Sequence, residues 1–253
     1  MSAADANPAT PEERSISEAL ADVRARMRAA TPSSSLDTQQ VRLVGVSKTK
    51  PAEAVMEAYA AGQRVFGENY TKEILEKAPL CPADVQWHFI GHMQSNKVKD
   101  VIEAVPNLVM VETVDSAKLA DKLEKACATF RPTSPLSIML QVNTSGEETK
   151  FGVEPSGCVP LATHIATQCK HLRLVGLMTI GQPDYSSRPE NFTVLSACRR
   201  EVALALGLAE QSLELSMGMS GDFEQAIQMG STNIRVGSTI FGARVYAEKP
   251  AVV

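Results

Sequence analysis

The chain has 253 residues, of which 44% are hydrophobic and 21% are charged, and its formal net charge is -4. A chain of this length can bury one large hydrophobic core, and the length suits a single α/β barrel. Lysines and arginines are interleaved with acidic residues, which gives no basic surface for nucleic acid, and no apolar run reaches the ~20 residues of a membrane span. We therefore expect a soluble protein of small-molecule chemistry, without nucleic-acid or membrane partners.

Five cysteines are scattered along the chain, with no Cys-x-x-Cys pair and no histidine at zinc-finger spacing. We interpret them as buried small residues of a reduced, cytoplasmic protein, and an additional organellar pool stays open. The five are Cys81, Cys127, Cys158, Cys169 and Cys198.

The two ends of the chain are expected to lie outside one central domain. Residues 1–13 are rich in alanine, proline and acidic residues and contain no apolar segment of a signal peptide. We expect residues 1–13 to form a disordered tail, residues 14–247 to form the domain, and residues 248–253 to form a C-terminal tail.

Apolar residues at helical spacing predict an amphipathic helix over residues 16–30. Short β-branched runs then alternate with longer helical patterns, which is typical of parallel strands joined by crossover helices. The expected strands are 41–47, 64–67, 87–91, 108–114, 137–143, 172–179, 213–217 and 234–237. The expected helices between them are 51–61, 71–77, 96–104, 116–129, 159–170, 190–206 and 223–229.

Eight strand-and-helix units are the number that closes a barrel. An open doubly wound sheet would show the same alternation, so the pattern alone leaves that alternative open. We predict an α/β fold, a single (β/α)8 TIM-type barrel with an extra N-terminal helix.

The first expected strand ends abruptly at Lys48, and Pro51 then begins a helix. The carboxyl ends of barrel strands form the face where chemistry takes place. A lysine beside apolar strand ends loses hydration, which favours the neutral amine and lets it attack an aldehyde to form a Schiff base. An ordinary solvated loop lysine is the alternative. Lys50 is one step further along, and we expect it to point outward to solvent.

Two segments rich in glycine and serine follow the last two expected strands. Residues 216–222 follow the seventh strand and open a helix, and residues 235–242 cover the end of the eighth. Barrels commonly bind phosphate with the backbone amides and hydroxyls of these loops. Each segment alone could be a turn with a helix cap. Together with Lys48 on one rim, they suit a phosphorylated aldehyde held at both ends.

Arg235 alternates with Val236 along the eighth expected strand, so its side chain can point into the barrel. An arginine there would donate a hydrogen bond to a pyridine nitrogen and keep that nitrogen unprotonated, which weakens the ring as an electron sink. The alternative is a buried ion pair with Glu68 or Glu112.

His88 and His92 lie four residues apart at the end of an expected strand. On a strand this spacing does not converge on one ion, so we expect no metal ligation there and no metal site in the chain.

Eight sequence motifs occur in an order that resembles one known family, the pyridoxal-phosphate homeostasis protein family, also called the YggS or PROSC family. The resemblance extends over residues 16–247. The motifs are residues 46–51, 66–70, 87–97, 140–143, 150–152, 176–180, 215–220 and 235–237.

The resemblance implies a fold like the N-terminal domain of alanine racemase and pyridoxal 5'-phosphate (PLP) held on Lys48 as a Schiff base. It implies a role in intracellular PLP and vitamin B6 homeostasis, with no established catalytic turnover and with PLP-dependent apo-enzymes as candidate recipients. Carried over by position, it assigns the phosphate to Ser216, Ser220, Gly237 and Ser238, the ring nitrogen to Arg235, and a place near the cofactor to Asn69. The family usually has Thr and then Ala after the glycine. Because Ser238 and Thr239 stand there instead, the hydroxyl that contacts the phosphate stays open.

Two enzymatic functions are the alternatives to PLP binding alone. A PLP-dependent amino-acid racemase needs a second acid or base opposite the lysine, which alanine racemases supply as a tyrosine from a second domain. We expect no second domain after the barrel, since the chain ends at Val253, and only Tyr70 lies near a strand end. An aldolase-like Schiff-base enzyme for sugar phosphates would explain the lysine and the phosphate loops but not Arg235.

Overall fold

The computed structural model describes residues 14–31, 41–147, 149–181 and 189–243. The expected tails at residues 1–13 and 248–253 lie outside the described residues, so the predicted domain limits stay a prediction. Among the described helices, none combines the length and the apolar composition that a membrane crossing requires.

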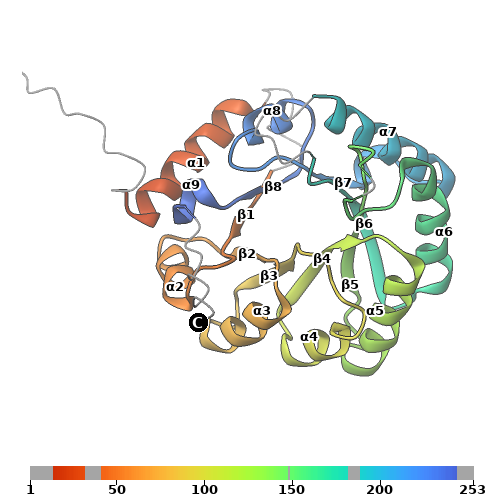
Figure 1. Cartoon of the computed structure of the whole chain (residues 1–253), viewed down its shortest axis with the longest axis horizontal. Coiled ribbons are helices and arrows are strands. Elements are labelled where there is room, and N and C mark those ends of the chain that lie inside the picture. Colours follow the sequence, from red (N-terminus) through yellow and green to blue (C-terminus); the bar gives the residue numbers. More distant parts are fainter. Residues whose placement is uncertain (1–13, 32–40, 148, 182–188, 244–253) are drawn as a thin grey trace, which may run out of the picture.

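Eight parallel strands follow one another around a closed barrel, and β1 pairs with β8 to complete the ring (Figure 1). The predicted (β/α)8 barrel is therefore confirmed, and the open-sheet alternative is excluded. The strands are β1 (Arg42–Val46), β2 (Val65–Glu68), β3 (Gln86–Phe89), β4 (Leu108–Val114), β5 (Leu136–Gln141), β6 (Leu172–Met178), β7 (Glu214–Ser216) and β8 (Asn233–Val236).

Helices surround the barrel on its outer side (Figure 1). The α-helices are α1 (Ile16–Ala30), α2 (Ala52–Ala60), α3 (Thr71–Lys77), α4 (Val98–Ala104), α5 (Ala117–Phe130), α6 (Cys158–Gln168), α7 (Pro189–Leu206), α8 (Phe223–Gln228) and α9 (Ser238–Phe241). Short 3-10 helices are η2 (Ala78–Leu80), η3 (Pro155–Gly157) and η4 (Glu210–Ser212).

The strands form because runs of apolar residues are buried on both faces, toward the barrel interior and toward the helices. Every residue of β5 is buried, which is why its sequence is a continuous run rather than an alternating one. Trp87 on β3 is also fully buried and packs against Phe66 on β2, with 5.9 Å between the ring centroids. The core therefore lies between the strands and the helices around them.

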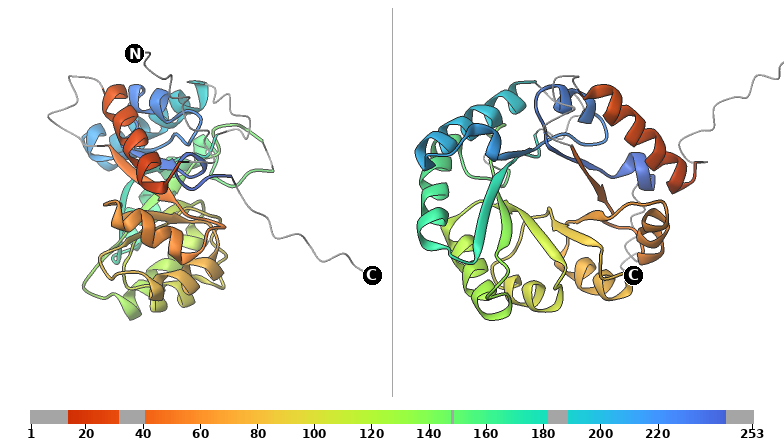
Figure 2. Two further views of the ribbon diagram at one scale, coloured as in Figure 1. Left: turned by 90° about the vertical axis from the view of Figure 1, so that its left-hand side faces the viewer. Right: turned by 180° about the vertical axis from the view of Figure 1, so that it is seen from behind.

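Helix α1 begins with a capping box, in which the Ser15 hydroxyl accepts from the backbone N–H of Glu18 and the Glu18 carboxylate accepts from that of Ser15. Its buried face joins the core through Leu20 and Val23. Both views in Figure 2 show α1, in red, beside the last two helices, in blue. The predicted N-terminal helix is therefore confirmed, and it covers the barrel where the first and last strands meet.

Several predicted element ends were wrong by one or two residues. The strand expected at residues 87–91 ends at Phe89 as β3, because the chain leaves the sheet to pass the backbone after β2. A Cβ atom at Gly91 would lie 2.0 Å from the carbonyl oxygen of Asn69, so only glycine fits there. The short α9 was not predicted, since the glycine-rich pattern before it reads as a loop.

Replacing Leu20 with alanine tests whether α1 is an integral part of the core. Leu20 is fully buried, so Leu20→Ala is expected to lower the free energy of unfolding by about 2–5 kcal/mol. Leu204 on α7 is 82% exposed, and Leu204→Ala is the matched control, with an expected change within about 0.5 kcal/mol. Urea unfolding measures both. Equal effects of the two substitutions would contradict the packing of α1.

Candidate functional site

The ends of β1 and β8 bring the predicted lysine and the predicted phosphate loop together. Gly45 on β1 pairs with Val236 on β8, so both strands end at the same level of the barrel. One step further, a Cβ atom at Gly237 would lie 3.3 Å from the Val46 carbonyl oxygen, which marks a close approach of the two backbones. Lys48, half-buried, follows two residues after Val46. The Lys48 turn and the loop after β8 are therefore neighbours on the catalytic face that barrels use.

The turn that carries Lys48 has a strained backbone. Thr49 adopts a φ of 63°, in the left-handed region that residues other than glycine rarely occupy and that costs roughly 1–3 kcal/mol. The Thr49 backbone N–H donates to Glu73 Oε2 at 2.8 Å, and the Lys50 N–H donates to the Ser47 carbonyl at 3.1 Å. These contacts hold a conformation that the residue itself disfavours, as is common at functional sites.

A second lysine, Lys77 on α3, is buried beneath this turn. Its Nζ donates to the Ser47 carbonyl at 2.9 Å, to Glu68 Oε1 at 2.8 Å and to Glu73 Oε2 at 2.6 Å. The Ser47 hydroxyl also donates to Glu68 Oε1, at 2.6 Å. The ion pairs of Lys77 therefore connect β2 and α3 to the backbone directly before Lys48.

Glu68, at the end of β2, is fully buried. Burial raises the pKa of its carboxyl to about 7, although Lys77 and the Ser47 hydroxyl favour the charged form. The neighbouring Glu73 carboxylate adds to the rise in the pKa of Glu68, because its negative charge repels a charged Glu68. Glu68 therefore exchanges its proton near neutral pH.

Lys50, which was predicted to point outward to solvent, has its ammonium group in a solvent-exposed contact with the backbone. Lys50 is half-buried, and its Nζ donates to the carbonyl oxygen of Ala243 at 2.7 Å. This contact ties the turn after β1 to the chain that leaves α9. The carbonyl after a short helix offers an acceptor that the sequence pattern does not reveal.

Arg235, on β8, points into the barrel interior and is 4% exposed. Its Nη2 donates to the Thr179 carbonyl at 2.7 Å, and its Nη1 donates to the Ser216 hydroxyl. Nη1 also lies 3.9 Å from Glu112 Oε2, so the ion pair that we considered as an alternative is present with Glu112 and not with Glu68. Burial lowers the pKa of Arg235, and the charge of Glu112 opposes that change.

Glu112, on β4, is the centre of the network around Arg235. His88 Nδ1 lies 2.6 Å from Glu112 Oε1, and Asn233 Nδ2 donates to both carboxylate oxygens at 3.1 and 3.2 Å. The Ser216 hydroxyl donates to Glu112 Oε2. Burial opposes the charge of Glu112, but the contacts with His88, Arg235 and Ser216 outweigh it and lower the pKa of the carboxyl. An anionic Glu112 therefore fixes both Ser216 and Arg235.

The predicted phosphate role of Ser216 stays a prediction. Its side chain is fully buried, and its hydroxyl contacts Glu112 and Arg235 and accepts from Asn233 Nδ2 at 2.9 Å. Ser216 thus lies beside Arg235 in the barrel interior.

The loops after β7 and β8 meet at Ser220. The Ser220 hydroxyl oxygen accepts from the backbone N–H groups of Gly237 at 3.2 Å and of Thr239 at 3.5 Å. Ser238 between them is exposed. Two amides that converge on one oxygen form a small anion-binding concavity. The site predicted for a phosphate therefore contains the donors that a phosphate oxygen needs.

Gly218 gives the loop after β7 its course. It has a φ of 94°, and a Cβ atom there would lie 2.5 Å from the Cβ of Ala226 on α8. A side chain at this position would push α8 away from the loop, so glycine keeps Ser220 close to β8.

Three buried oxygens near the ends of β1 and β2 have no hydrogen-bond partner among the described residues. They are Thr49 Oγ1, Glu68 Oε2 and Asn69 Oδ1. An unsatisfied buried acceptor costs about 1–3 kcal/mol, so such atoms are expected to contact a ligand or water. One of these residues is Asn69, which was predicted to lie near a cofactor and which directly follows β2, the strand beside β1.

His88 on β3 and His92, three residues after the strand ends, do not converge. His88 is buried against Glu112, whereas His92 stacks on Phe151 with 3.7 Å between the ring centroids and lies 3.8 Å from Asp115. His88 and Asn233 were missed as supports of the site, and so was Lys77. An acid at position 112 within the apolar β4 was the available signal for a buried network.

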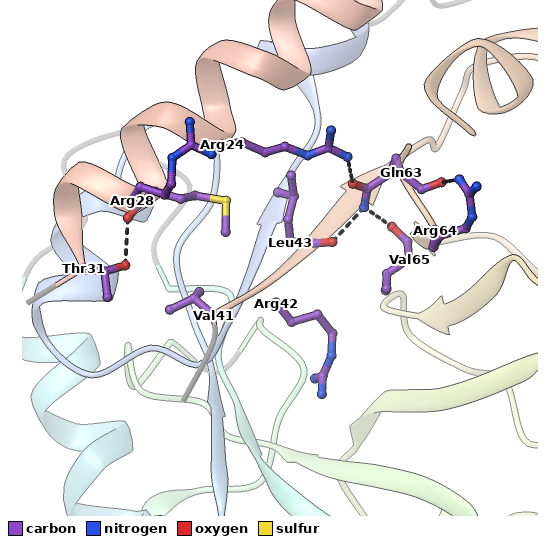
Figure 3. Close-up of a pocket in the computed structure, with 10 residues that line it drawn as sticks. Arg24, Arg28, Thr31, Val41, Arg42, Leu43, Gln63, Arg64 and Val65 are labelled. Atoms are coloured by element: carbon purple, nitrogen blue, oxygen red, sulfur yellow. Dashed lines mark hydrogen bonds between the residues drawn. The ribbon is translucent and has the colours of Figure 1, made fainter. Parts of the chain in front are cut away.

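A cavity of about 760 Å³ lies at the opposite, amino-terminal end of the barrel, between α1 and the beginnings of β1 and β2 (Figure 3). Gln63 Nε2 donates there to the carbonyls of Leu43 and Val65, and Arg24 donates to Gln63 Oε1 at 3.2 Å (Figure 3). This end of a barrel serves stability, so the cavity is separate from the predicted site.

Comparisons of the chain with a family model, with known proteins and with solved structures agree with one another. A family model described as alanine racemase, N-terminal domain, matches residues 20–245, which confirms the predicted likeness to that domain. The pyridoxal phosphate homeostasis protein of Mus musculus is 53% identical over 222 residues, covering 84% of this chain and 80% of the relative. PipY of Synechococcus elongatus, solved without PLP, has 33% identity and a TM-score of 0.75, covering 90% of this chain and 100% of PipY. PipY with PLP bound has 32% identity and a TM-score of 0.71 at the same coverage.

The buried Glu68 predicts a particular pH dependence of stability. Its pKa is about 7 in the folded chain against an ordinary value of 4.5, so its stabilising contribution is complete below pH 4.5 and is lost as the pH rises through 7. Glu68→Gln lacks this group, so the wild-type chain is expected to lose stability relative to the variant over that range. Urea unfolding at a series of pH values measures the difference.

Glu76→Gln is the matched control, because Glu76 lies on α3 with its side chain 62% exposed. Its stability profile is expected to run parallel to that of the wild type. A Glu68→Gln profile that is also parallel would contradict the raised pKa.

Proposed function

Because the chain belongs to the pyridoxal phosphate homeostasis protein family, we propose that it binds PLP on Lys48 as a Schiff base and serves intracellular vitamin B6 homeostasis without catalytic turnover. The observation that carries the proposal is the meeting of the Lys48 turn with the amides of Gly237 and Thr239 at one rim of the barrel. PipY, which covers most of this chain, has a structure with PLP bound.

The phosphate end of PLP fits the loops after β7 and β8. The amides of Gly237 and Thr239 converge on one oxygen, and the hydroxyls of Ser220 and Ser238 belong to the same two loops. We propose that these groups hold the phosphate, with Thr239 contributing its N–H. The exposed Ser238 is then free to turn its hydroxyl toward the anion.

The ring end fits Arg235 in the barrel interior. A buried guanidinium held by Ser216 and the Thr179 carbonyl keeps its direction, and it donates hydrogen bonds without accepting any. We propose that Arg235 donates to the pyridine nitrogen. For Ser216 we propose that it orients Arg235, in place of the phosphate contact expected from the sequence, because its hydroxyl already contacts Glu112, Asn233 and Arg235. Asn69, with its buried and unsatisfied Oδ1, contacts the cofactor from the opposite side of the Lys48 turn.

The aldehyde of PLP condenses reversibly with an amine, which is the chemistry the cofactor supplies here. Lys48 provides that amine on a turn whose backbone is fixed by Lys77 and Glu73. The fixed turn keeps the amine near the phosphate loop, so binding the phosphate raises the local concentration of aldehyde.

Two features support binding without turnover. Racemisation needs a second acid or base opposite the lysine. Of the two tyrosines within the described residues, Tyr59 donates its hydroxyl hydrogen to Asp84 at 2.7 Å. Tyr70 is 53% exposed at the start of α3. In addition, a pyridine nitrogen that accepts from arginine stays unprotonated and stabilises a carbanion poorly. We propose a carrier or buffer of PLP, with PLP-dependent apo-enzymes as recipients.

A cytoplasmic location accompanies this role in the proposal. All five cysteines are free thiols, which suits a reducing compartment. The prediction that all five are buried is wrong for Cys81, which is half-buried beside η2.

Lys48→Ala is expected to abolish the visible chromophore that forms when PLP is added, because the variant lacks the amine that is proposed to condense with the aldehyde. Lys50→Ala is the matched control and is expected to keep the chromophore. Absorbance titration of both variants with PLP measures this difference. A full chromophore in Lys48→Ala would overturn the assignment of the lysine.

Ser220→Ala is expected to weaken PLP affinity about tenfold or more, because a hydrogen bond to a charged group contributes about 1.5–3 kcal/mol. The Schiff base should still form at excess PLP. Ser212→Ala removes a hydroxyl before β7 that donates to the Ala209 carbonyl, and it serves as the control with unchanged affinity. Equal affinities of all three chains would count against the phosphate site.

Absence of turnover has its own test. The PLP-loaded chain is incubated with L-alanine in D2O, and exchange of the α-proton is followed by NMR. We expect exchange no faster than with free PLP at the same concentration. Exchange well above that level, lost in Lys48→Ala, would favour the racemase alternative.

A further inference from the structure

A cluster of three different side chains joins α5 to α6 on the outer side of the barrel, where these two helices are neighbours (Figure 1). Asp121 lies on α5, His164 lies on α6, and Cys169 is the residue that ends α6. One carboxylate oxygen, one ring nitrogen and the thiol sulfur lie within 4.8 Å of one another. Asp121 is exposed, His164 is half-buried and Cys169 is buried, so the cluster extends from solvent into the helix interface.

The distances between the three ligand atoms are close to those around a tetrahedrally coordinated metal ion. Metal–ligand bonds of about 2.0–2.3 Å place tetrahedral ligand atoms roughly 3.3–3.8 Å apart. His164 Nε2 and Asp121 Oδ1 are now 2.7 Å apart in a hydrogen bond and would separate slightly. The remaining pairs lie within 4.8 Å and would close by up to about 1.5 Å. Asp121 is exposed and His164 is half-buried, so rotation of these two side chains toward Cys169 can supply the movement.

The surroundings of the cluster are acidic and contain a second histidine. Glu124 lies one turn after Asp121 on α5, and its carboxylate accepts from the His171 backbone N–H at 2.8 Å and lies 2.7 Å from His171 Nδ1. Two carboxylates from one helix thus face the end of α6. Such a site attracts a divalent cation.

We propose that Asp121, His164 and Cys169 bind a zinc ion, with water as the fourth ligand. A set of one sulfur, one nitrogen and one oxygen suits zinc and excludes magnesium and calcium, which prefer oxygen ligands. Binding replaces the thiol proton, which passes to solvent, and uses the lone pair of the imidazole. No redox change accompanies it. The ion cross-links two helices that pack against adjacent parts of the barrel wall.

A surface ion pair between Asp121 and His164 is the simpler explanation of their contact. It accounts for two of the three residues, and Cys169 alone would be an ordinary small residue of the core, so what supports the site is that the thiol lies within 4.8 Å of both other ligand atoms. Because 43 residues separate Asp121 from His164, helix packing had to bring them together, so the absence of a metal motif in the sequence does not count against the site.

The binding of zinc to the full-length chain, loaded with PLP, tests the proposal. Isothermal titration with Zn²⁺ in the presence of a thiol-free reductant is expected to give one ion per chain, and Mg²⁺ is expected to give none. Co²⁺ should produce the absorbance of thiolate coordination. Cys169→Ser, His164→Gln and Asp121→Asn should each weaken Zn²⁺ binding about tenfold or more, since even the loss of groups that only orient metal ligands costs 10–100-fold.

Two matched controls distinguish this site from its neighbours. Cys81→Ser removes the half-buried thiol, and His171→Gln removes the histidine beside Glu124, and both should keep Zn²⁺ affinity within about twofold. Zn²⁺ binding that is lost in His171→Gln but retained in His164→Gln would overturn the proposal, as would equal binding by the wild type and Cys169→Ser. Thermal unfolding in EDTA, which removes bound metal, verifies that each variant is folded. If Cys169→Ser does not fold, the exposed Asp121→Asn tests the site in its place.

Discussion

The rest of the site depends on the buried ion pairs of Lys77. One ammonium group bonds two carboxylates and the carbonyl before Lys48, in a region almost closed to solvent. Removing one partner from such a cluster leaves an uncompensated buried charge, which is strongly destabilising. The cluster therefore holds Thr49 in its strained conformation, and the position of Lys48 follows from it. Thr49 Oγ1, Glu68 Oε2 and Asn69 Oδ1, buried close to this turn, have no hydrogen-bond partner among the described residues, so they can accept hydrogen bonds from a polar ligand or from water.

A second buried network, inside the barrel, fixes Arg235 as the first network fixes the Lys48 turn. Glu112 gathers His88, Ser216 and Asn233 from three other strands, and Arg235 is held at its edge. In the proposed function the two networks fix different ends of one site, since one fixes the backbone on either side of Lys48 and the other orients the Arg235 guanidinium. Between them the loops after β7 and β8 supply backbone amides. A rigid barrel thus presents three kinds of group with little freedom to rearrange, which favours retention of a bound cofactor.

Much of the fold and of the candidate site was predictable from the sequence. The count of eight units favoured a barrel but left an open sheet as an alternative, and the family resemblance decided between them. The position of Lys48 after an apolar run placed it at the rim. The predicted ends of helices and strands were less accurate. An apolar pattern reports which residues are buried, whereas a strand ends where its hydrogen bonds to the neighbouring strand end. The apolar run of β3 continues past Phe89, but the chain has left the sheet by Gly91. Lys77 and the cluster of Asp121, His164 and Cys169 were beyond reach, since their partners come from packing and not from spacing along the chain.

The central claim is that one particular lysine carries the cofactor, and peptide mass mapping of a reduced adduct tests it most directly. The wild-type chain is saturated with PLP, reduced with borohydride and digested, and the modified lysine is identified. The account predicts a single main adduct at Lys48, with Lys50 and Lys77 unmodified because both amines are committed to other groups. A main adduct at any other lysine, or the absence of an adduct, would contradict it.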